Sequence, residues 1–339
     1  MTEIKDPFDD ITSSEDEDDS SVSRCRYIDL NLPSSCLRPH CVRPFPPSSP
    51  PPPPLAFILD DVFTESECEM IIKHSSLVPS PTIPGHVGHA YITKAAHVAD
   101  DGSTSYVDIA KPNAHKLSVF TSDKIHSILC RKLAAPIRLH VPDDFGSSSS
   151  SSSPSSPSPQ QHSSAVVQML NPRLRVLRYD SSAEDRFDPH YDAKTVVREQ
   201  NLVSLITVLL YLNDGPSDGG GGRTLFLHDP KLGIGGGGVN SGTGNSKLSP
   251  ETTFPPESCT AVTPRRGRCV IFEHDIYHCG ERLRGSPTGG ENVIKYVLRT
   301  DIMFSAKLAE ATAPSQAPPL SPSSFTGFPP PAPPPPSFP

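Results

Sequence analysis

Apolar residues at helical spacing predict two helices in the first half of the chain. Thr64 and Glu67 fit the two ends of a capping box, with Thr64 as the N-cap residue. The apolar stripe that follows consists of Cys68, Ile71 and Ile72, and a second stripe, over residues 122–135, consists of Ile125, Ile128, Leu129 and Leu133. Pro136 lies just beyond the expected end of this second helix. Residues 56–63 predict an edge strand that leads into the first helix, and both helices are expected to pack outside a sheet.

From residue 174 onward the pattern changes to strands. Short runs rich in apolar and β-branched residues are separated by Gly- and Pro-rich turns, at 174–179, 202–212, 223–228, 268–273 and 293–299. The run 202–212 is almost continuously apolar, which is typical of a strand buried on both faces. No helical pattern lies between these strands. The sequence therefore predicts a mainly β protein with flanking helices and a sandwich or jelly-roll core.

Composition limits where a core can form. The 41 prolines, together with Ser and Gly, gather in blocks that lack the apolar area needed to offset the entropy of ordering. We therefore expect one domain over residues 55–306, with low-complexity insertions at about 146–164 and 231–258. The flanking segments 1–54 (acidic, then Pro-rich) and 307–339 (Pro-rich) are expected to be disordered.

The net charge of the chain comes from its first 20 residues. The first 20 residues hold nine acids and one base, a net charge of −8, which equals the value for the whole chain. The remaining residues balance at 29 acids and 29 bases, since the totals are 38 and 30. A balanced body gives no electrostatic reason to expect nucleic acid or a membrane surface as a partner.

No segment has the length and apolarity of a membrane span, and the acidic N-terminus does not fit a signal peptide. The eight cysteines are accordingly expected to be reduced thiols, and the protein to be cytoplasmic or nuclear. The Pro-rich ends are candidates for docking into aromatic-lined peptide-binding modules.

Candidate chemistry lies in the late strands. The run RFDPHYD contains the only His-x-Asp of the chain, His190 and Asp192, and the run FEHDIYHCG supplies further histidines. In an extended strand residues i and i+2 share a face, so His190 and Asp192 can bind one metal while Tyr191 points away. Two histidines and one carboxylate can occupy one face of an octahedral Fe(II) and leave positions open for a co-substrate and oxygen.

Two alternatives stay open at this stage. Either His274 or His278 could supply the second histidine, because both follow the strand that ends at Phe272; we favour His278 and expect His274 to lie at the rim. A zinc site is the other alternative, since zinc takes Cys and His, and its ligands would be Cys269, His274, His278 and Cys279. That set lacks a Cys-x-x-Cys pair and leaves His-x-Asp unused.

From about residue 55 to residue 304 the chain resembles the 2-oxoglutarate- and Fe(II)-dependent dioxygenases, most closely the prolyl 4-hydroxylase catalytic-domain type. The resemblance rests on several short motifs that occur together and in order: Tyr179, FDPHYD (187–192), LLYLN (209–213), GGRTLF (221–226), PRRGRCVIF (264–272), HCG (278–280) and KYVLRTDIMF (295–304). It implies a double-stranded β-helix core with His190, Asp192 and His278 as iron ligands. It also implies Fe(II) and 2-oxoglutarate as cofactors, with ascorbate as a further candidate.

The resemblance further implies a basic residue on the last strand that holds the distal carboxylate of 2-oxoglutarate. Lys295 matches the family position, although it follows His278 by 17 residues, a gap longer than usual that the turn-like run 285–292 would explain. Arg299 lies on the same face of an extended strand and remains the alternative, or a structural partner of Asp301. Tyr179 matches a tyrosine that can hydrogen-bond the co-substrate.

The expected function is therefore an Fe(II)- and 2-oxoglutarate-dependent dioxygenase that hydroxylates a protein side chain, with proline as the first candidate, and releases succinate and carbon dioxide. Two alternatives remain: hydroxylation of a small molecule, and a catalytically degenerate barrel that acts as an interaction scaffold. The residues give no information on the substrate itself.

Overall fold

The computed structural model describes most of the expected domain and a short segment before it. The described residues are 25–38, 53–80, 83, 85–91, 94–98, 104–108, 115–142, 145, 167–216, 219–233, 254–284 and 292–305. The acidic start, the Ser/Pro tract, most of the Gly/Ser insertion and the Pro-rich tail lie outside these residues, as does most of the turn-like run 285–292.

Two antiparallel sheets form the core of the fold. The large sheet has ten strands, and its main order is β1 (Arg26–Asp29), β2 (Ala56–Asp60), β14 (Cys269–Glu273), β11 (Leu202–Tyr211), β16 (Ile294–Ser305), β8 (Leu174–Asp180), β6 (Lys116–Phe120) and β3 (Ala90–Tyr91). Two further strands extend it, β10 (Val196–Val197) beside β11 and β7 (Val167–Leu170) beside β16. The small sheet has the order β13 (Cys259–Val262), β12 (Thr224–Leu227), β15 (His278–Gly280) and β9 (Phe187–His190). A separate hairpin pairs β4 (Lys94–Val98) with β5 (Thr104–Asp108).

This arrangement confirms the prediction of a mainly β, jelly-roll fold with flanking helices. All five strand runs expected after residue 174 form strands, and β16 continues six residues beyond the predicted end at Arg299. The long antiparallel pairing of β11 with β16 places the two strands side by side at the centre of the large sheet. Residues far apart in the sequence are thereby brought together, as the candidate site requires.

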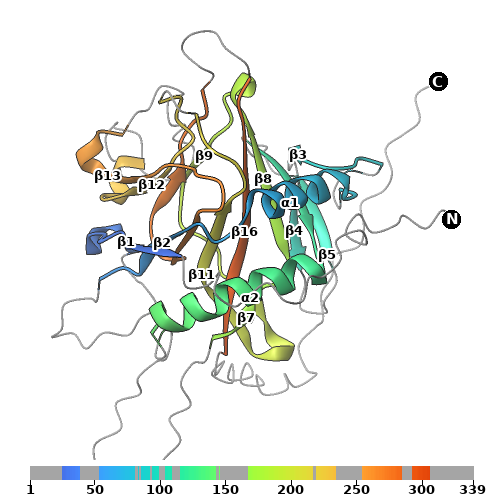
Figure 1. The fold of residues 1–339 in the computed structure, drawn as a ribbon, viewed down its shortest axis with the longest axis horizontal. Helices are drawn as coiled ribbons and strands as arrows, with labels where there is room; N and C mark the ends of the chain where they lie inside the picture. The colour runs from blue at the N-terminus through green and yellow to red at the C-terminus, as the bar shows by residue number, and fades with distance from the viewer. Residues whose placement is uncertain are drawn as a thin grey trace, which may run out of the picture. The chain divides into compact units, whose positions relative to one another are not determined.

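The two helices cover one face of the large sheet. Both α1 (Glu65–Leu77) and α2 (Asp123–His140) contribute apolar side chains to a cluster with the even-numbered residues of β11 and β16, such as Val208 and Leu298. Figure 1 shows α2 crossing the strands of this sheet. The Thr64 hydroxyl accepts from the backbone N–H of Glu67, and the Glu67 carboxylate accepts from that of Thr64, so the predicted capping box is present.

The predicted end of α2 was wrong. The helix continues past Pro136 to His140, although proline lacks the N–H of a helical hydrogen bond and usually kinks or ends a helix. Pro136 and Ile137 are both buried, and the backbone N–H of Val141 donates to the carbonyl of Ile137. Packing against the core therefore outweighs the lost hydrogen bond here.

The opposite face of the large sheet points toward the small sheet. Side chains alternate along a strand, so odd-numbered residues of β8, β11 and β16, such as Tyr179, Tyr211 and Val297, belong to a second apolar cluster. Phe226 of β12 joins this cluster from the small sheet. The candidate chemistry lies in this space between the sheets.

The prediction that residues 1–54 are disordered was wrong for residues 25–38. Strand β1 pairs with β2, and Leu32, Cys36 and Leu37 are buried in the apolar cluster between the sheets. Strand β2 is therefore an interior strand between β1 and β14, with all five residues buried, and not the predicted edge. A few apolar side chains were enough to anchor this segment, although the residues around it are polar and Pro-rich.

No helix among the described residues is long and apolar enough to cross a membrane. The seven cysteines in the described part of the chain form no disulfide with one another.

Candidate active site

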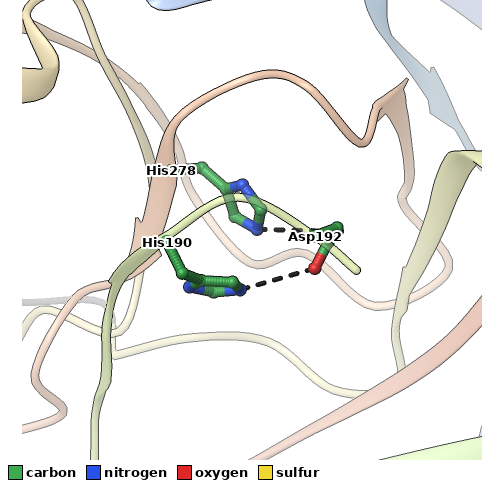
Figure 2. A group of neighbouring side chains, drawn as sticks. All are labelled: His190, Asp192 and His278. Atoms are coloured by element: carbon green, nitrogen blue, oxygen red, sulfur yellow. Dashed lines mark ion pairs between the residues drawn. The ribbon is translucent and has the colours of Figure 1, made fainter. Parts of the chain in front are cut away.

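His190, Asp192 and His278 come together between the two sheets. His190 ends β9 and His278 begins β15, and the two are direct partners in the antiparallel pairing of these strands. His190 Nε2 lies 3.4 Å from Asp192 Oδ1, and His278 Nε2 lies 3.8 Å from Asp192 Oδ2. Figure 2 shows both imidazole rings directed at the carboxylate. One ligand atom from each residue falls within 4.8 Å of the other two.

Asp192 does not lie on the strand that carries His190. Strand β9 ends at His190, and the expectation that a shared strand face brings the two side chains together was wrong in this detail. The backbone N–H of Asp192 instead donates to the carbonyl of His274 at 3.0 Å. This bond ties the residue to the turn that leads into β15, so Asp192 and His278 are held by the same short stretch of backbone.

Both histidines are fixed in the tautomer that a metal ligand needs. His190 Nδ1 lies 2.8 Å from the carbonyl oxygen of Asp188, and His278 Nδ1 lies 2.9 Å from that of Ile276. A carbonyl only accepts, so Nδ1 carries the hydrogen in each ring and, in the neutral ring, Nε2 keeps its lone pair. His190 Nε2 is buried without a hydrogen-bond partner among the described residues. Lone pairs that converge on one point without a donor between them fit a cation.

The electrostatics of the cluster favour the metal-binding forms. Burial alone raises the pKa of Asp192, but the Arg299 guanidinium and the two imidazoles hold it well below the usual range. Burial lowers the pKa of His278 to about 3. The carboxylate is therefore charged and His278 neutral at physiological pH, and metal ligands are deprotonated in this way.

The three residues of the cluster line a cavity between the two sheets. Lys295 and Arg299 of β16 and Tyr179 of β8 line this cavity together with all three members of the cluster. The remaining lining is largely apolar, and it includes Leu177, Phe187, Leu209, Cys279 and Val297. The predicted metal ligands and the predicted co-substrate residues therefore share one cavity.

Lys295 is buried and forms no ion pair at contact distance with a carboxylate of the described residues. Only 2 % of the residue is exposed, and its ammonium group donates to the carbonyl oxygen of Gly222 at 2.6 Å. The same group lies 4.4 Å from the centre of the Tyr179 ring, within the range of a cation–π contact. Among the described residues no carboxylate oxygen lies within 4.0 Å of this nitrogen. Burial accordingly lowers the pKa of Lys295 to about 7.

Arg299 has the opposite surroundings. Its Nη1 lies 2.7 Å from Asp192 Oδ1, and its Nη2 lies 3.6 Å from Asp301 Oδ1. The guanidinium is thus compensated by two carboxylates within the protein. Strand parity placed Lys295 and Arg299 on the same face, which the structure confirms, but their ion pairs separate the two.

His274, the other histidine of the run FEHDIYHCG, does not belong to the metal-ligand cluster. His274 is fully buried, with Nε2 3.5 Å from Asp301 Oδ1, so the expectation that it lies at the rim was wrong. The zinc alternative is not supported either. The only group of possible metal ligands within the described residues is His190, Asp192 and His278.

Three residues near the site were not predicted to take part. The Thr207 hydroxyl donates to Asp192 Oδ2. Thr224 lines the cavity, and its hydroxyl accepts from the Tyr211 hydroxyl. The His115 ring packs against the Tyr179 ring, with the ring centroids 5.2 Å apart. Thr207 was visible as one of two polar residues, with Ser204, in a largely apolar buried strand, a pattern that usually indicates a specific partner. Nothing in the sequence placed His115 beside Tyr179.

Comparison with known proteins identifies the class. Residues 174–297 match the model of the 2OG-Fe(II) oxygenase superfamily, and this segment contains every residue of the candidate site except Arg299. No curated protein matched the sequence. The matched segment carries a 2OG-Fe(II) oxygenase domain. The protein is an enzyme of the 2-oxoglutarate-dependent dioxygenase class, and its cofactors are Fe(II) and 2-oxoglutarate.

Several solved structures are similar at low identity. A viral collagen prolyl hydroxylase from Paramecium Bursaria Chlorella virus-1 is 13% identical, covers 74% of this chain and 96% of its own, and has a TM-score of 0.38. HygX from Streptomyces hygroscopicus, with nickel and 2-oxoglutarate bound, is 12% identical over 75% of this chain and 84% of its own, with a TM-score of 0.39. A prolyl-4-hydroxylase from Pseudomonas putida is 15% identical over 57% and 73%, with a TM-score of 0.30. Similarity at this level carries no argument about the substrate.

Proposed function

We propose that this enzyme hydroxylates a protein side chain, with a prolyl residue as the first candidate, and that His190, Asp192 and His278 hold its Fe(II). The observation that carries the proposal is the pairing of two features in one cavity. In one part of it, two imidazole nitrogens and a carboxylate face one another. The same cavity is lined by a buried lysine, Lys295, that has no carboxylate oxygen within 4.0 Å among the described residues.

Some residues of the cavity bind the metal and the co-substrate, and others exclude water. Bound Fe(II) supplies the oxygen chemistry, in which 2-oxoglutarate is decarboxylated to succinate as the substrate is hydroxylated. Lys295 pairs with the distal carboxylate of 2-oxoglutarate, and the Tyr179 hydroxyl assists. The apolar walls formed by residues such as Leu177, Leu209 and Val297 keep water from the cavity and strengthen the charge pair.

The choice of a protein substrate rests on the motifs that resemble the prolyl 4-hydroxylase type, above all FDPHYD and KYVLRTD around His190 and Lys295. A small-molecule substrate remains the second candidate. The need for ascorbate and the place of the protein in the cell remain predictions, as does the docking of partners on the Pro-rich ends, which lie outside the described residues.

The test combines turnover with metal binding. Purified protein is incubated with Fe(II), 2-oxoglutarate and a panel of proline-containing peptides, and both succinate and oxygen added to the peptide are measured. We expect His190→Ala and His278→Ala to lose Fe(II) binding and succinate formation. His228→Ala is the matched control, because this histidine bonds to Glu257 and Thr260 outside the cavity.

The possible outcomes separate the alternatives. Succinate formation without peptide oxidation, restored by a small molecule, overturns the protein substrate but keeps the enzyme class. A wild-type protein that binds Fe(II) and 2-oxoglutarate but forms no succinate with any substrate supports the scaffold alternative. Wild-type iron binding in His278→Ala shows that the second histidine ligand is wrong.

A further inference from the structure

The carboxylate of Asp192 is contacted at both of its oxygens from the large sheet. The Arg299 guanidinium lies 2.7 Å from Oδ1, and the Thr207 hydroxyl donates to Oδ2. Thr207 belongs to β11 and Arg299 to β16, which are neighbouring, directly paired strands. Asp192 itself lies in a loop, so two paired strands of the large sheet contact a side chain that the loop carries.

A further carboxylate, that of Asp301, lies close to Arg299 and is itself close to two other basic side chains. Asp301, which is 1 % exposed, lies two positions further along β16 and is the strand partner of Thr207. Its carboxylate is 3.6 Å from Arg299 Nη2 and 3.5 Å from His274 Nε2, and the other oxygen is 3.3 Å from Arg175 Nη1. Keeping such charges out of water is costly unless each is paired, so the pairs strongly restrict where Arg299 can lie.

We infer that Arg299 and Thr207 are positioning residues that clamp the Asp192 carboxylate in the orientation needed for the metal, and that Arg299 does not anchor the co-substrate. The inference rests on the proposed metal site. A carboxylate contacted at both oxygens is restrained from rotating out of place. Partners of this kind, outside the ligands themselves, typically contribute about 10–100-fold to metal affinity or activity.

The first test replaces Thr207 with valine, which has the same shape but no hydroxyl. Co(II) serves as a non-turnover probe, and its affinity is measured by titration of its visible absorption. We expect Thr207→Val to weaken Co(II) binding by about 10-fold or more and to change the Co(II) spectrum. At saturating Co(II), the affinity for 2-oxoglutarate should stay within about twofold of wild type, because no group that contacts Lys295 has changed.

Thr300→Val is the matched control. Thr300 is also a fully buried β-strand threonine, and its hydroxyl donates to the carbonyl of Asn171 at 2.7 Å. Thr300→Val loses the same kind of buried hydrogen bond as Thr207→Val. Thr300 follows Arg299 directly in β16, so its side chain points to the other face of the sheet, away from the cavity. Thr300→Val should lose stability and keep wild-type Co(II) affinity and spectrum.

Arg299→Lys provides the second test, since it keeps the charge but loses the planar fork that contacts two carboxylates. We expect weakened Co(II) binding with 2-oxoglutarate affinity preserved at saturating metal. The reverse split, a selective loss of 2-oxoglutarate affinity, assigns Arg299 as the co-substrate anchor and overturns the inference. Wild-type Co(II) affinity in both Thr207→Val and Arg299→Lys also overturns it.

The histidine variants keep this inference separate from the proposed function. If His190→Ala and His278→Ala bind Co(II) as wild type does, the metal site itself is wrong. If they lose Co(II) while Thr207→Val and Arg299→Lys do not, the metal site stands and the clamp fails.

Discussion

Replacing Lys295 should disable co-substrate binding and leave the metal site intact. The lysine is buried in the cavity and has no carboxylate oxygen within 4.0 Å among the described residues, so its replacement by methionine removes a cation that is not held in an ion pair. No proposed metal ligand contacts it. We therefore expect Lys295→Met to bind Fe(II) as wild type does and to lose affinity for 2-oxoglutarate.

The size of the loss follows from the burial of the pair. Removing one partner of a buried, hydrogen-bonded charge pair costs about 2–5 kcal/mol. At about 1.4 kcal/mol for each factor of ten, the dissociation constant for 2-oxoglutarate should rise by about 30-fold or more. Lys132→Met is the control, because this lysine pairs with Glu67 at 3.0 Å near helix α1, outside the cavity.

The low pKa of Lys295 adds a pH dependence with a definite sign. With a pKa of about 7 in the free enzyme, the lysine loses its proton as the pH rises, and only the protonated form attracts the carboxylate. The apparent dissociation constant rises as the protonated fraction falls, by about tenfold for each pH unit above about 7. Binding at about pH 8 should accordingly take up close to one proton.

Calorimetry under argon, in buffers with different ionisation enthalpies, measures both the affinity and the proton uptake. Lys295→Arg carries a cation at every pH used, so it should remove the pH dependence, and Lys295→Met should bind weakly throughout. An affinity for 2-oxoglutarate that is constant between about pH 7 and pH 9 in the wild type, without proton uptake, refutes this account of Lys295.

Two further predictions concern the stability of the fold. Truncation before residue 25 should leave the melting temperature unchanged, whereas truncation before residue 53 removes β1 and the buried Leu32, Cys36 and Leu37. At about 1.5–3 kcal/mol for each buried large apolar side chain, the longer truncation should lower the free energy of unfolding by at least about 3 kcal/mol. Equal melting temperatures for the two truncated proteins would contradict the role of this segment. Thr64→Ala should lower the free energy of unfolding by about 1 kcal/mol in chemical denaturation while Thr64→Ser retains it, and an equal loss in both would show that the capping hydroxyl is not the cause.

Local patterns in the sequence predicted local structure well. The capping box of α1, the apolar stripe of α2 and the buried run of β11 each depend on residues a few positions apart, and all three form. The same is true of the shared face of Lys295 and Arg299, because side chains alternate along β16.

Features that depend on distant partners could not be predicted. Strand β1 is only four residues long, and nothing near it in the sequence shows that β2 will pair with it. The parity of β16 could not separate Lys295 from Arg299, because the difference lies in which residues reach them from elsewhere in the fold. Asp192 reaches Arg299 from a loop, whereas the Lys295 ammonium group contacts the carbonyl of Gly222 and the Tyr179 ring.

The segment 25–38 also affects the order in which the site can be assembled. The backbone carbonyl of Cys36 accepts from the N–H of Tyr277, and the N–H of Arg38 donates to the carbonyl of Asp275, so residues far upstream in the chain hold the turn that precedes His278. Strand β1 can pair with β2 soon after both are made, but the backbone groups of Cys36 and Arg38 have no partner until the turn at 275–277 is made. Pairings this distant in sequence form slowly. A partial chain already contains His190 and Asp192 but lacks His278 and Lys295. If the proposed assignments hold, iron and 2-oxoglutarate can be held together only after the chain has been made past Lys295, and synthesis itself delays the oxidative chemistry until the strands that line the cavity are present.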